Sequence, residues 1–224
     1  MSHSVRRHLR LDIDEYDATI RRFIPGYEEM IATAARAVAA GGPEWVLDLG
    51  AGTGALAGAV LDLTEDTTVE LLDVDEVMLG RARVRLSRFG DRARFTVGSF
   101  DEPLSPCDAV MASLALHHVP TLEAKAGLFG RAHQALRPGG VLVNADVTMP
   151  AIGPGRDDAY QAWADHLVSG GMSRQEAFDH FAAWSSEDTY FPMEAELEAL
   201  GAAGFESSCP WRRGVSTVVV GRRL

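Results

Sequence analysis

The sequence predicts an α/β protein built on a doubly wound sheet that ends in an antiparallel hairpin. Three observations predict this fold. Short β-rich runs alternate with helical segments over residues 45–146, a glycine-rich turn follows the first run, and two β-rich runs close the chain. Strands that alternate with helices form parallel sheets with crossover helices, whereas strands joined by a short turn pair antiparallel.

The first elements follow from apolar spacing. Residues 27–40 carry apolar side chains at helical intervals, and a Gly-Gly-Pro sequence stops this helix before the run WVLDL. Four further β-rich runs follow, TVELLDV, ARFTVG, DAVMAS and GVLVNAD. Residues 76–89 and 121–136 have helical character, and Gly90 is expected to cap the first of these two helices.

Residues 150–188 interrupt the alternation with two helical segments. Tyr160, Trp163 and Leu167 share one helical face, and Ser173 with Glu176 fits a capping box before the second segment. A helix over 195–203 then leads to FESSCPW and STVVVGRR, which are joined by a turn around Gly214. This ending predicts the antiparallel hairpin.

Composition limits the partners. A formal net charge of -11 works against binding to nucleic acid or anionic lipid. No stretch approaches the roughly 18–20 apolar residues of a membrane span, and the first 14 residues lack the apolar core of a signal peptide, so we expect a cytoplasmic protein. Cys107 and Cys209 lie far apart and are expected to be free thiols.

The stretch WVLDLGAGTGALAGAV contains the first functional motif. Gly50, Gly52 and Ala55 fit the G-x-G-x-x-G/A pattern, which lets the backbone turn sharply and approach a nucleotide. The pattern by itself is compatible with a nicotinamide or flavin dinucleotide and with S-adenosylmethionine. Asp48 favours the second, because its carboxylate repels a pyrophosphate and attracts an ammonium and a sulfonium. A P-loop is excluded because the motif lacks a Gly-Lys-Ser/Thr ending.

Two carboxylates follow the next β-rich run. Asp73 comes directly after this strand, where a carboxylate can accept hydrogen bonds from both ribose hydroxyls of an adenosine. Asp75 is better placed as the N-cap of the following helix. We therefore expect Asp73 to bind the ribose and Asp75 to cap the helix.

At this point the sequence resembles the class I S-adenosylmethionine-dependent methyltransferases. VLDLGAGTG, LLDVDEVML, SLALHHV and ALRPGGVLVNAD are similar to motifs of that family and occur in the family's order. The resemblance is strong over 45–146 and looser over the C-terminal ELEALGAAGF and hairpin. It implies a seven-stranded Rossmann-like sheet and S-adenosylmethionine as cofactor.

The resemblance also implies the cofactor contacts. They are Asp48, Gly50, Ala51, Gly52, Gly54, Asp73, Val74, Ser99, Phe100, Ser113 and Leu114. One position departs from the family, because many members carry Asp where this chain has Ser99. Ser99 and Phe100 are expected to line the adenine pocket through a hydroxyl or backbone bond and a ring contact.

The N-terminal segment IDEYDATIRRFIPGYEEM is similar to the segment that folds over the cofactor in several small-molecule methyltransferases. On this resemblance Tyr16 and Arg21 close the cofactor site, with Arg21 near the cofactor carboxylate, and Tyr27 contacts the acceptor. Helix packing and solvent exposure are the alternative roles of these side chains.

Methyl transfer is an in-line displacement at an activated carbon, so an enzyme mainly aligns the two reactants and excludes water. Histidines 117 and 118 follow the fourth strand, and Asp146 ends the fifth, so these three are the candidates for acid–base assistance. Structural roles in loops are the alternative for all three. Tyr160 and Trp163 are candidate acceptor contacts, with core packing as the alternative. No clustered carboxylates follow the fourth strand, so no metal is expected.

The sequence thus predicts a single domain over residues 1–224. Residues 1–40 form N-terminal lid helices, 45–146 the cofactor-binding core, 150–190 a helical acceptor lid, and 191–224 the terminal helix and hairpin. The expected reaction is methyl transfer to the oxygen, nitrogen or carbon of a small apolar or aromatic acceptor, in specialised metabolism. A tRNA-modification enzyme, an NAD-dependent oxidoreductase and a cofactor-binding module without catalysis are the alternatives.

A basic stripe interrupts the acidic sequence. Its members are Arg81, Arg83, Arg85, Arg88, Arg92 and Arg94. A solvated helix face paired with the chain's own acids is one interpretation, and a docking patch for an acidic carrier protein is the other. A homodimer is a further option for partners.

Overall fold

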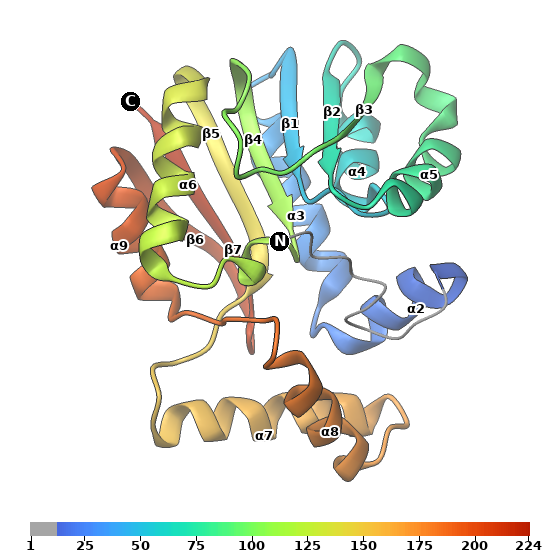
Figure 1. Ribbon diagram of the computed structural model, residues 1–224, viewed down its shortest axis with the longest axis vertical. Coiled ribbons are helices and arrows are strands. Elements are labelled where there is room, and N and C mark those ends of the chain that lie inside the picture. Colours follow the sequence, from blue (N-terminus) through green and yellow to red (C-terminus); the bar gives the residue numbers. More distant parts are fainter. Residues whose placement is uncertain (1–12) are drawn as a thin grey trace.

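The computed structural model describes residues 13–224, with side chains from residue 16 onward. Its centre is a seven-stranded sheet in the order β3-β2-β1-β4-β5-β7-β6 (Figure 1). The neighbouring strands β3, β2, β1, β4 and β5 run parallel to one another, whereas β7 runs antiparallel to both β5 and β6. The predicted doubly wound sheet and terminal hairpin are therefore confirmed. Residues 1–12 of the expected N-terminal lid, and most of the stretch considered for a signal peptide, lie outside the described residues.

The strands fall where the β-rich runs predicted them, with one extension. The fifth strand begins four residues earlier than the apolar run, because Leu136 already pairs with Cys107, and the pairing shifts register before it resumes at Val141. The seven strands are β1 (Trp45–Leu49), β2 (Thr68–Asp73), β3 (Ala93–Val97), β4 (Cys107–Ser113), β5 (Leu136–Val147), β6 (Phe205–Arg213) and β7 (Ser216–Arg223).

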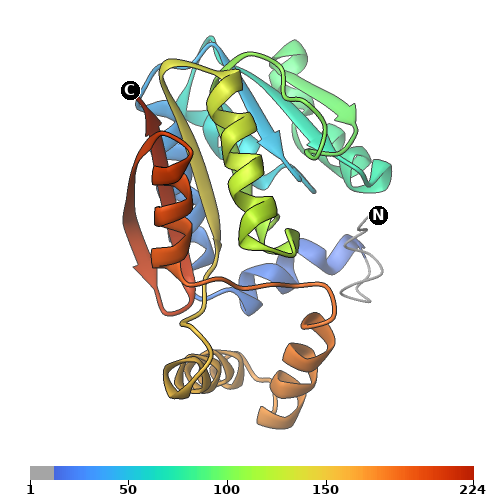
Figure 2. The same ribbon diagram turned by 60° about the vertical axis from the view of Figure 1, so that its left-hand side comes forward.

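Helices cover both faces of the sheet (Figure 2). One apolar core joins the sheet to α3 (Tyr27–Ala39), α4 (Ala55–Leu63) and α5 (Glu76–Arg85). A second core on the opposite face joins it to α6 (Leu122–Ala135) and α9 (Met193–Ala202). Alternate residues of each central strand enter the two cores, as expected for a sheet buried on both sides.

One predicted helix ends earlier than expected. The helix over 76–89 stops at Arg85, and a 3-10 segment, η1 (Ser87–Arg92), follows it. Gly90 lies inside that segment with φ of 57° and does not cap α5. Leu86 is buried although it follows the last residue of α5, so the predicted end of this helix was wrong.

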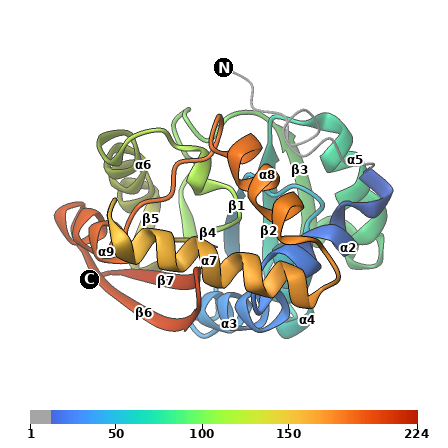
Figure 3. The same cartoon turned by 90° about the horizontal axis from the view of Figure 1, so that it is seen from below.

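A helical layer lies across the carboxyl ends of the strands (Figure 3). It consists of α2 (Ile13–Phe23) and of the insertion helices α7 (Pro154–Ser169) and α8 (Arg174–Trp184). Ser173 and Glu176 form the predicted capping box at the start of α8. None of the helices in the described part of the chain combines the length and apolarity needed to cross a bilayer.

A buried ion pair joins the two helices of the second core. Lys125 on α6 donates to Glu196 on α9 at 2.6 Å, and Asn144 of β5 donates to the other oxygen of Glu196 at 3.2 Å. Both charged side chains are almost completely buried. Each charge depends on its partner, because removal of one leaves the other buried without compensation.

Lys125→Met should therefore lower the free energy of unfolding by about 3–5 kcal/mol, since it leaves Glu196 buried and uncompensated. The double variant Lys125→Met/Glu196→Gln should recover most of this loss, because Gln is neutral and its carbonyl can still accept from Asn144. Urea unfolding measures both effects. Equal destabilisation of the single and double variants would contradict the proposed dependence.

Candidate active site

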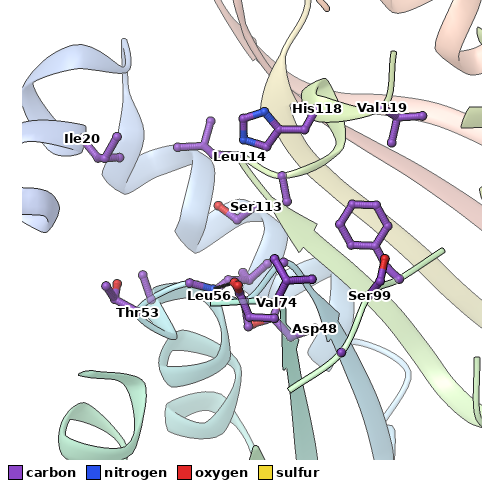
Figure 4. Close-up of a pocket in the computed structure, with 18 of the residues that line it drawn as sticks. Ile20, Asp48, Thr53, Leu56, Val74, Ser99, Ser113, Leu114, His118 and Val119 are labelled. Carbon is purple, nitrogen blue, oxygen red and sulfur yellow. Dashed lines mark hydrogen bonds between the residues drawn. The ribbon is translucent and has the colours of Figure 1, made fainter. Parts of the chain in front are cut away.

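The main cavity lies at the carboxyl ends of β1, β2 and β4 and has a volume of about 290 Å³ (Figure 4). Parallel strands bring their carboxyl ends to one edge of the sheet, and a crevice forms where the strand order reverses. Residues from both sides of that point line the cavity. They include Asp48, Gly50, Ala51, Gly52, Asp73, Val74, Ser99, Phe100, Ser113, Leu114 and His118.

The glycine turn forms the floor of the cavity. Gly50 and Gly52 have φ of 65° and 54°, a region that favours glycine. A Cβ on Gly50 would lie 2.6 Å from the Cβ of Ala115, so a side chain cannot be accommodated there without movement. Gly54, predicted as a cofactor contact, does not line the cavity. A Cβ on it would lie 3.0–3.2 Å from the side chains of Leu86, Leu71 and Ala82, so Gly54 serves close packing.

Asp73 is held at the end of β2 by backbone amides. One carboxylate oxygen accepts from the Gly52 amide at 2.7 Å and the other from the Asp75 amide at 2.8 Å. Burial raises the pKa of Asp73, although these two bonds oppose the shift. Each oxygen keeps a second lone pair, so the carboxylate can also accept two hydroxyl groups from a ligand. Asp75 caps α5 through Val77 and Met78, as predicted.

Asp48 is the second carboxylate of the cavity. Its side chain is buried, and its Oδ1 atom has no hydrogen-bond partner among the described residues. Burial and the neighbouring charge of Asp73 raise the pKa of Asp48 to about 8. A cation in the cavity would compensate both carboxylates, because buried charges require a partner.

Helix α2 closes one side of the cavity. Tyr16, Ile20 and the following Tyr27 line it. Asp17 anchors this helix, because its carboxylate accepts from Thr53 of the glycine turn and forms an ion pair with Arg85 of α5. The structure does not bring Arg21 to the cavity. Arg21 pairs with Glu28 at 2.6 Å, with half of its side chain exposed.

The opposite wall comes from β3, β4 and the loops after them. Ser99 and Phe100 lie on one side, and Figure 4 shows Ser113 and Leu114 on the β4 side of the cavity. Leu114 has φ of 51°, which marks a strained turn immediately after β4. The Ser99 hydroxyl lies 3.1 Å from the Asp101 carboxylate within its own loop.

A smaller cavity of about 50 Å³ continues from the main one. Tyr16, Ile20, Leu114 and His118 line both cavities, so they form the passage between them. The smaller cavity is mostly apolar and aromatic. It is also lined by Phe23, Ile24, His117, Val147, Trp163, Trp184, Asp188 and Tyr190.

Trp163 and Tyr160, the two acceptor contacts predicted in the insertion, lie in different surroundings. Trp163 lines the smaller cavity, and its indole N–H donates to the Phe23 carbonyl at 2.7 Å. Tyr160 lines neither of these cavities and packs on Phe181, with ring centroids 5.2 Å apart. The shared helical face is therefore partly core and partly cavity wall.

A polar cluster closes the histidine end of the smaller cavity. His117 Nδ1 lies 2.6 Å from Oδ1 of Asp146, whose other oxygen accepts from the His117 amide. Asp146 is fully buried behind His117 and lines neither cavity. Burial alone lowers the pKa of His117, and the charges of Asp146 and Asp188 outweigh it and raise the pKa to about 9.

Asp188 is the member of this cluster that the sequence did not predict. Its Oδ1 lies 3.2 Å from His118 Nδ1 and 3.7 Å from His117 Nε2, and its Oδ2 accepts from the Tyr190 hydroxyl. The segment that carries Asp188 and Tyr190 follows α8 without a regular element. Neither periodicity nor a motif connects it with the histidines, which lie about seventy residues earlier.

The basic stripe is largely used within the chain. Arg85 anchors α2, Arg88 pairs with Asp62 at 2.7 Å, and Arg92 donates to backbone carbonyls of residues 61, 64 and 65. This arrangement agrees with a helix face paired with the chain's own acids. It gives no specific support to the docking of an acidic carrier protein.

Comparison with known proteins agrees with the fold and the motifs. Residues 47–142 match the family described as "Methyltransferase domain". The match spans the glycine turn, β2, β3 and β4, the part of the chain whose motifs resemble the class I S-adenosylmethionine-dependent methyltransferases. The chain is also 30% identical over 105 residues to the reducing polyketide synthase Preu2 of Preussia isomera, a match that covers 44% of this chain and 4% of that protein.

Solved structures show the same fold at low identity. An O-methyltransferase family protein from Burkholderia thailandensis has a TM-score of 0.68 at 19% identity, with 88% of this chain and 55% of that chain covered. Human N-acetylserotonin methyltransferase in complex with S-adenosylmethionine has a TM-score of 0.61 at 17% identity, with coverage of 99% and 63%. NcsB1, an O-methyltransferase from neocarzinostatin biosynthesis, gives 0.56 at 21%, with coverage of 84% and 50%. The chain thus spans 50–63% of the length of these proteins.

The raised pKa of Asp48 predicts a pH-dependent stability. Between about pH 4 and about pH 8, Asp48 is protonated in the folded protein and ionised in the unfolded chain. The free energy of unfolding therefore falls as the pH rises through this range, because the folded state binds the additional proton. The stability of Asp48→Asn relative to the parent should therefore increase over the same range. Urea unfolding at a series of pH values measures it, with the exposed Asp66→Asn as control. A difference that does not change with pH would contradict the assignment.

Proposed function

We propose that this chain transfers the methyl group of S-adenosylmethionine to a small, largely apolar or aromatic acceptor. The observation that carries the proposal is the pair of buried carboxylates, Asp48 and Asp73, that face one cavity beside a glycine turn. S-adenosylmethionine supplies an activated methyl carbon, a positively charged amino acid end and an adenosine. The residues of the cavity fit each of these parts.

Asp73 is proposed to accept the two ribose hydroxyls, since its carboxylate is fixed by backbone amides and keeps lone pairs toward the cavity. Asp48 is proposed to compensate the cationic end of the cofactor, because its buried Oδ1 has no partner among the described residues. Ser99 and Phe100 are proposed to border the adenine. Human N-acetylserotonin methyltransferase and NcsB1 were both solved in complex with S-adenosylmethionine, which supports the same cofactor here.

The acceptor is proposed to enter the smaller cavity, whose walls are apolar and aromatic. NcsB1 was solved with 2-hydroxy-5-methyl naphthoic acid, so a hydroxylated aromatic compound is the first class to test. The similarity to a polyketide synthase and to an enzyme of neocarzinostatin biosynthesis supports a role in specialised metabolism.

The chain contributes mainly alignment in the proposed mechanism. The aromatic walls and α2 exclude water and hold the acceptor beside the methyl group, within the roughly 3–3.5 Å of a near-attack arrangement. His118 lies at the passage between the two cavities, and His117 with Asp146 stands next to it. These polar groups are proposed to receive the reacting end of the acceptor.

The other functions receive less support. An NAD-dependent oxidoreductase would place a pyrophosphate beside Asp48 and Asp73, where two carboxylates oppose it. A tRNA-modification enzyme would need a basic surface, and the net charge is -11 with three stripe arginines committed to intrachain contacts. Neither a second copy of the chain nor a carrier protein is needed to complete the proposed site.

Cofactor binding tests the ribose assignment through a matched pair of variants. Asp73→Asn should bind S-adenosylhomocysteine roughly ten- to hundredfold more weakly, about 1.5–3 kcal/mol, because a neutral amide replaces a charged acceptor. Asp75→Asn should bind normally, since Asn also caps helices. Calorimetry measures both affinities. Normal binding by Asp73→Asn, or a larger loss in Asp75→Asn, would contradict the assignment.

Turnover tests the proposed function itself. The purified protein should transfer radiolabelled methyl from S-adenosylmethionine to at least one member of a panel of small hydroxylated aromatic compounds. Gly50→Val should abolish this transfer, because its side chain collides with Ala115 in the cavity floor. High affinity for NAD together with none for S-adenosylhomocysteine would refute the proposal.

A further inference from the structure

We propose that Arg156 is a positioning residue for the acceptor end of the site, an inference that rests on the proposed function. Arg156 belongs to the first turn of α7 and lines neither cavity, so it acts through other residues. Its guanidinium holds the return segment, residues 185–192, which leads the chain from α8 back to α9 (Figure 1). This segment carries Asp188 and Tyr190, which both line the smaller cavity.

Arg156 joins the two ends of the insertion. Its Nη1 donates to the Pro150 carbonyl at 3.1 Å, and its Nη2 donates to the Tyr190 carbonyl at 3.1 Å. Pro150 lies shortly after β5, and Tyr190 lies shortly before α9, so the two carbonyls belong to the chain that enters the insertion and the chain that leaves it. A guanidinium suits this arrangement, because its donors lie in a fixed plane and can reach two acceptors together.

The return segment forms no helix or strand of its own, so individual hydrogen bonds determine where it lies. The Thr189 amide donates to the His117 carbonyl at 2.8 Å, and the Phe191 carbonyl accepts from the Met149 amide at 3.0 Å. Figures 1 and 2 show this segment crossing the chain that leaves β5. The bonds from Arg156 strengthen this crossing, and they limit how far the backbone of the return segment can shift.

The position of the return segment matters because His117 lies between two carboxylates. Asp146 of β5 lies 2.6 Å from its Nδ1, whereas Asp188 of the return segment lies 3.7 Å from its Nε2. Asp188 also lies 3.2 Å from Nδ1 of His118. Because Arg156 binds both the chain just after β5 and the return segment, it fixes the separation between the two elements that carry these carboxylates.

The effect of Arg156 should be confined to the acceptor end. Residues 150–192 are all described by the structure, and none of them lines the main cavity. The smaller cavity, in contrast, is lined by Asp188, Tyr190 and two tryptophans of the insertion. A misplacement of about 1 Å at a reacting group can cost roughly a hundredfold in rate. Loss of Arg156 should therefore slow the reaction of the acceptor without changing the affinity for the cofactor.

The test compares Arg156→Met and Arg156→Lys with the parent, each as the full chain. Amides of residues 185–192 should exchange hydrogen roughly three- to tenfold faster in Arg156→Met, the factor expected from the loss of one net hydrogen bond. With an acceptor identified by the turnover panel, kcat/KM should fall roughly tenfold to a hundredfold. Calorimetry should give the parent's affinity for S-adenosylhomocysteine. Arg156→Lys should recover part of the loss, because its ammonium can reach one carbonyl but lacks the planar fork.

Arg174→Met is the matched control within the same insertion. Arg174 lies on α8 and contacts Gln161 and Asp165 of α7, so it joins the two insertion helices to each other. It should match the parent in the exchange of the return segment and in kcat/KM.

Parent-like exchange of residues 185–192 in both Arg156 variants would overturn the proposal, and so would faster exchange at an unchanged kcat/KM. An equal loss of cofactor affinity would also overturn it, because Arg156 would then support the whole fold. Circular dichroism verifies folding, and Arg156→Lys provides the test if Arg156→Met is not folded. Hydrogen exchange needs no acceptor, so its result is separate from a failure of the parent to transfer methyl groups, which would refute the proposed function.

Discussion

The hydrogen bond from the Gly52 amide to the Asp73 carboxylate joins the glycine turn after β1 to the end of β2, and the shape of the main cavity depends on it. Two further amides of the turn, those of Gly50 and Ala51, donate to the carbonyl of Leu72. These bonds form because parallel pairing of β1 with β2 brings both strand ends to the same edge. The carboxylate therefore shapes the turn and also faces the main cavity.

The burial of charged carboxylates away from water is the main free-energy cost of the two cavities. Asp48 and Asp73 lie together in the main cavity, and Asp146 and Asp188 lie at the histidine end. Buried carboxylates require compensation: Asp146 and Asp188 lie beside His117, whose pKa they raise to about 9, whereas Asp48 Oδ1 has no hydrogen-bond partner among the described residues. The proposed cationic cofactor would compensate Asp48 and Asp73 in the main cavity. The two cavities are adjacent, because His118 lines both of them.

The layer across the strand ends joins parts of the chain that are distant in sequence. Trp163 of α7 bonds to the backbone of α2 and lines the smaller cavity, and Asp188 reaches the histidines that follow β4. Arg85, in a stripe that could be interpreted as a docking patch, anchors α2 over the glycine turn. The insertion thus lines only the smaller cavity, whereas Tyr16 and Ile20 of α2 line both.

The sequence by itself determined the sheet, the glycine turn, Asp73 and the histidines after β4, because periodicity and short motifs report contacts that are local along the chain. It could not place Gly54 under α5, Arg21 against Glu28 or Tyr160 outside the cavities. A residue type and a helical face do not specify which neighbour a side chain meets. Asp188 shows the limit most clearly. Its carboxylate is positioned by Tyr190 and by the packing of α8 against α2 and α7, so only the tertiary structure could bring it within 3.2 Å of His118.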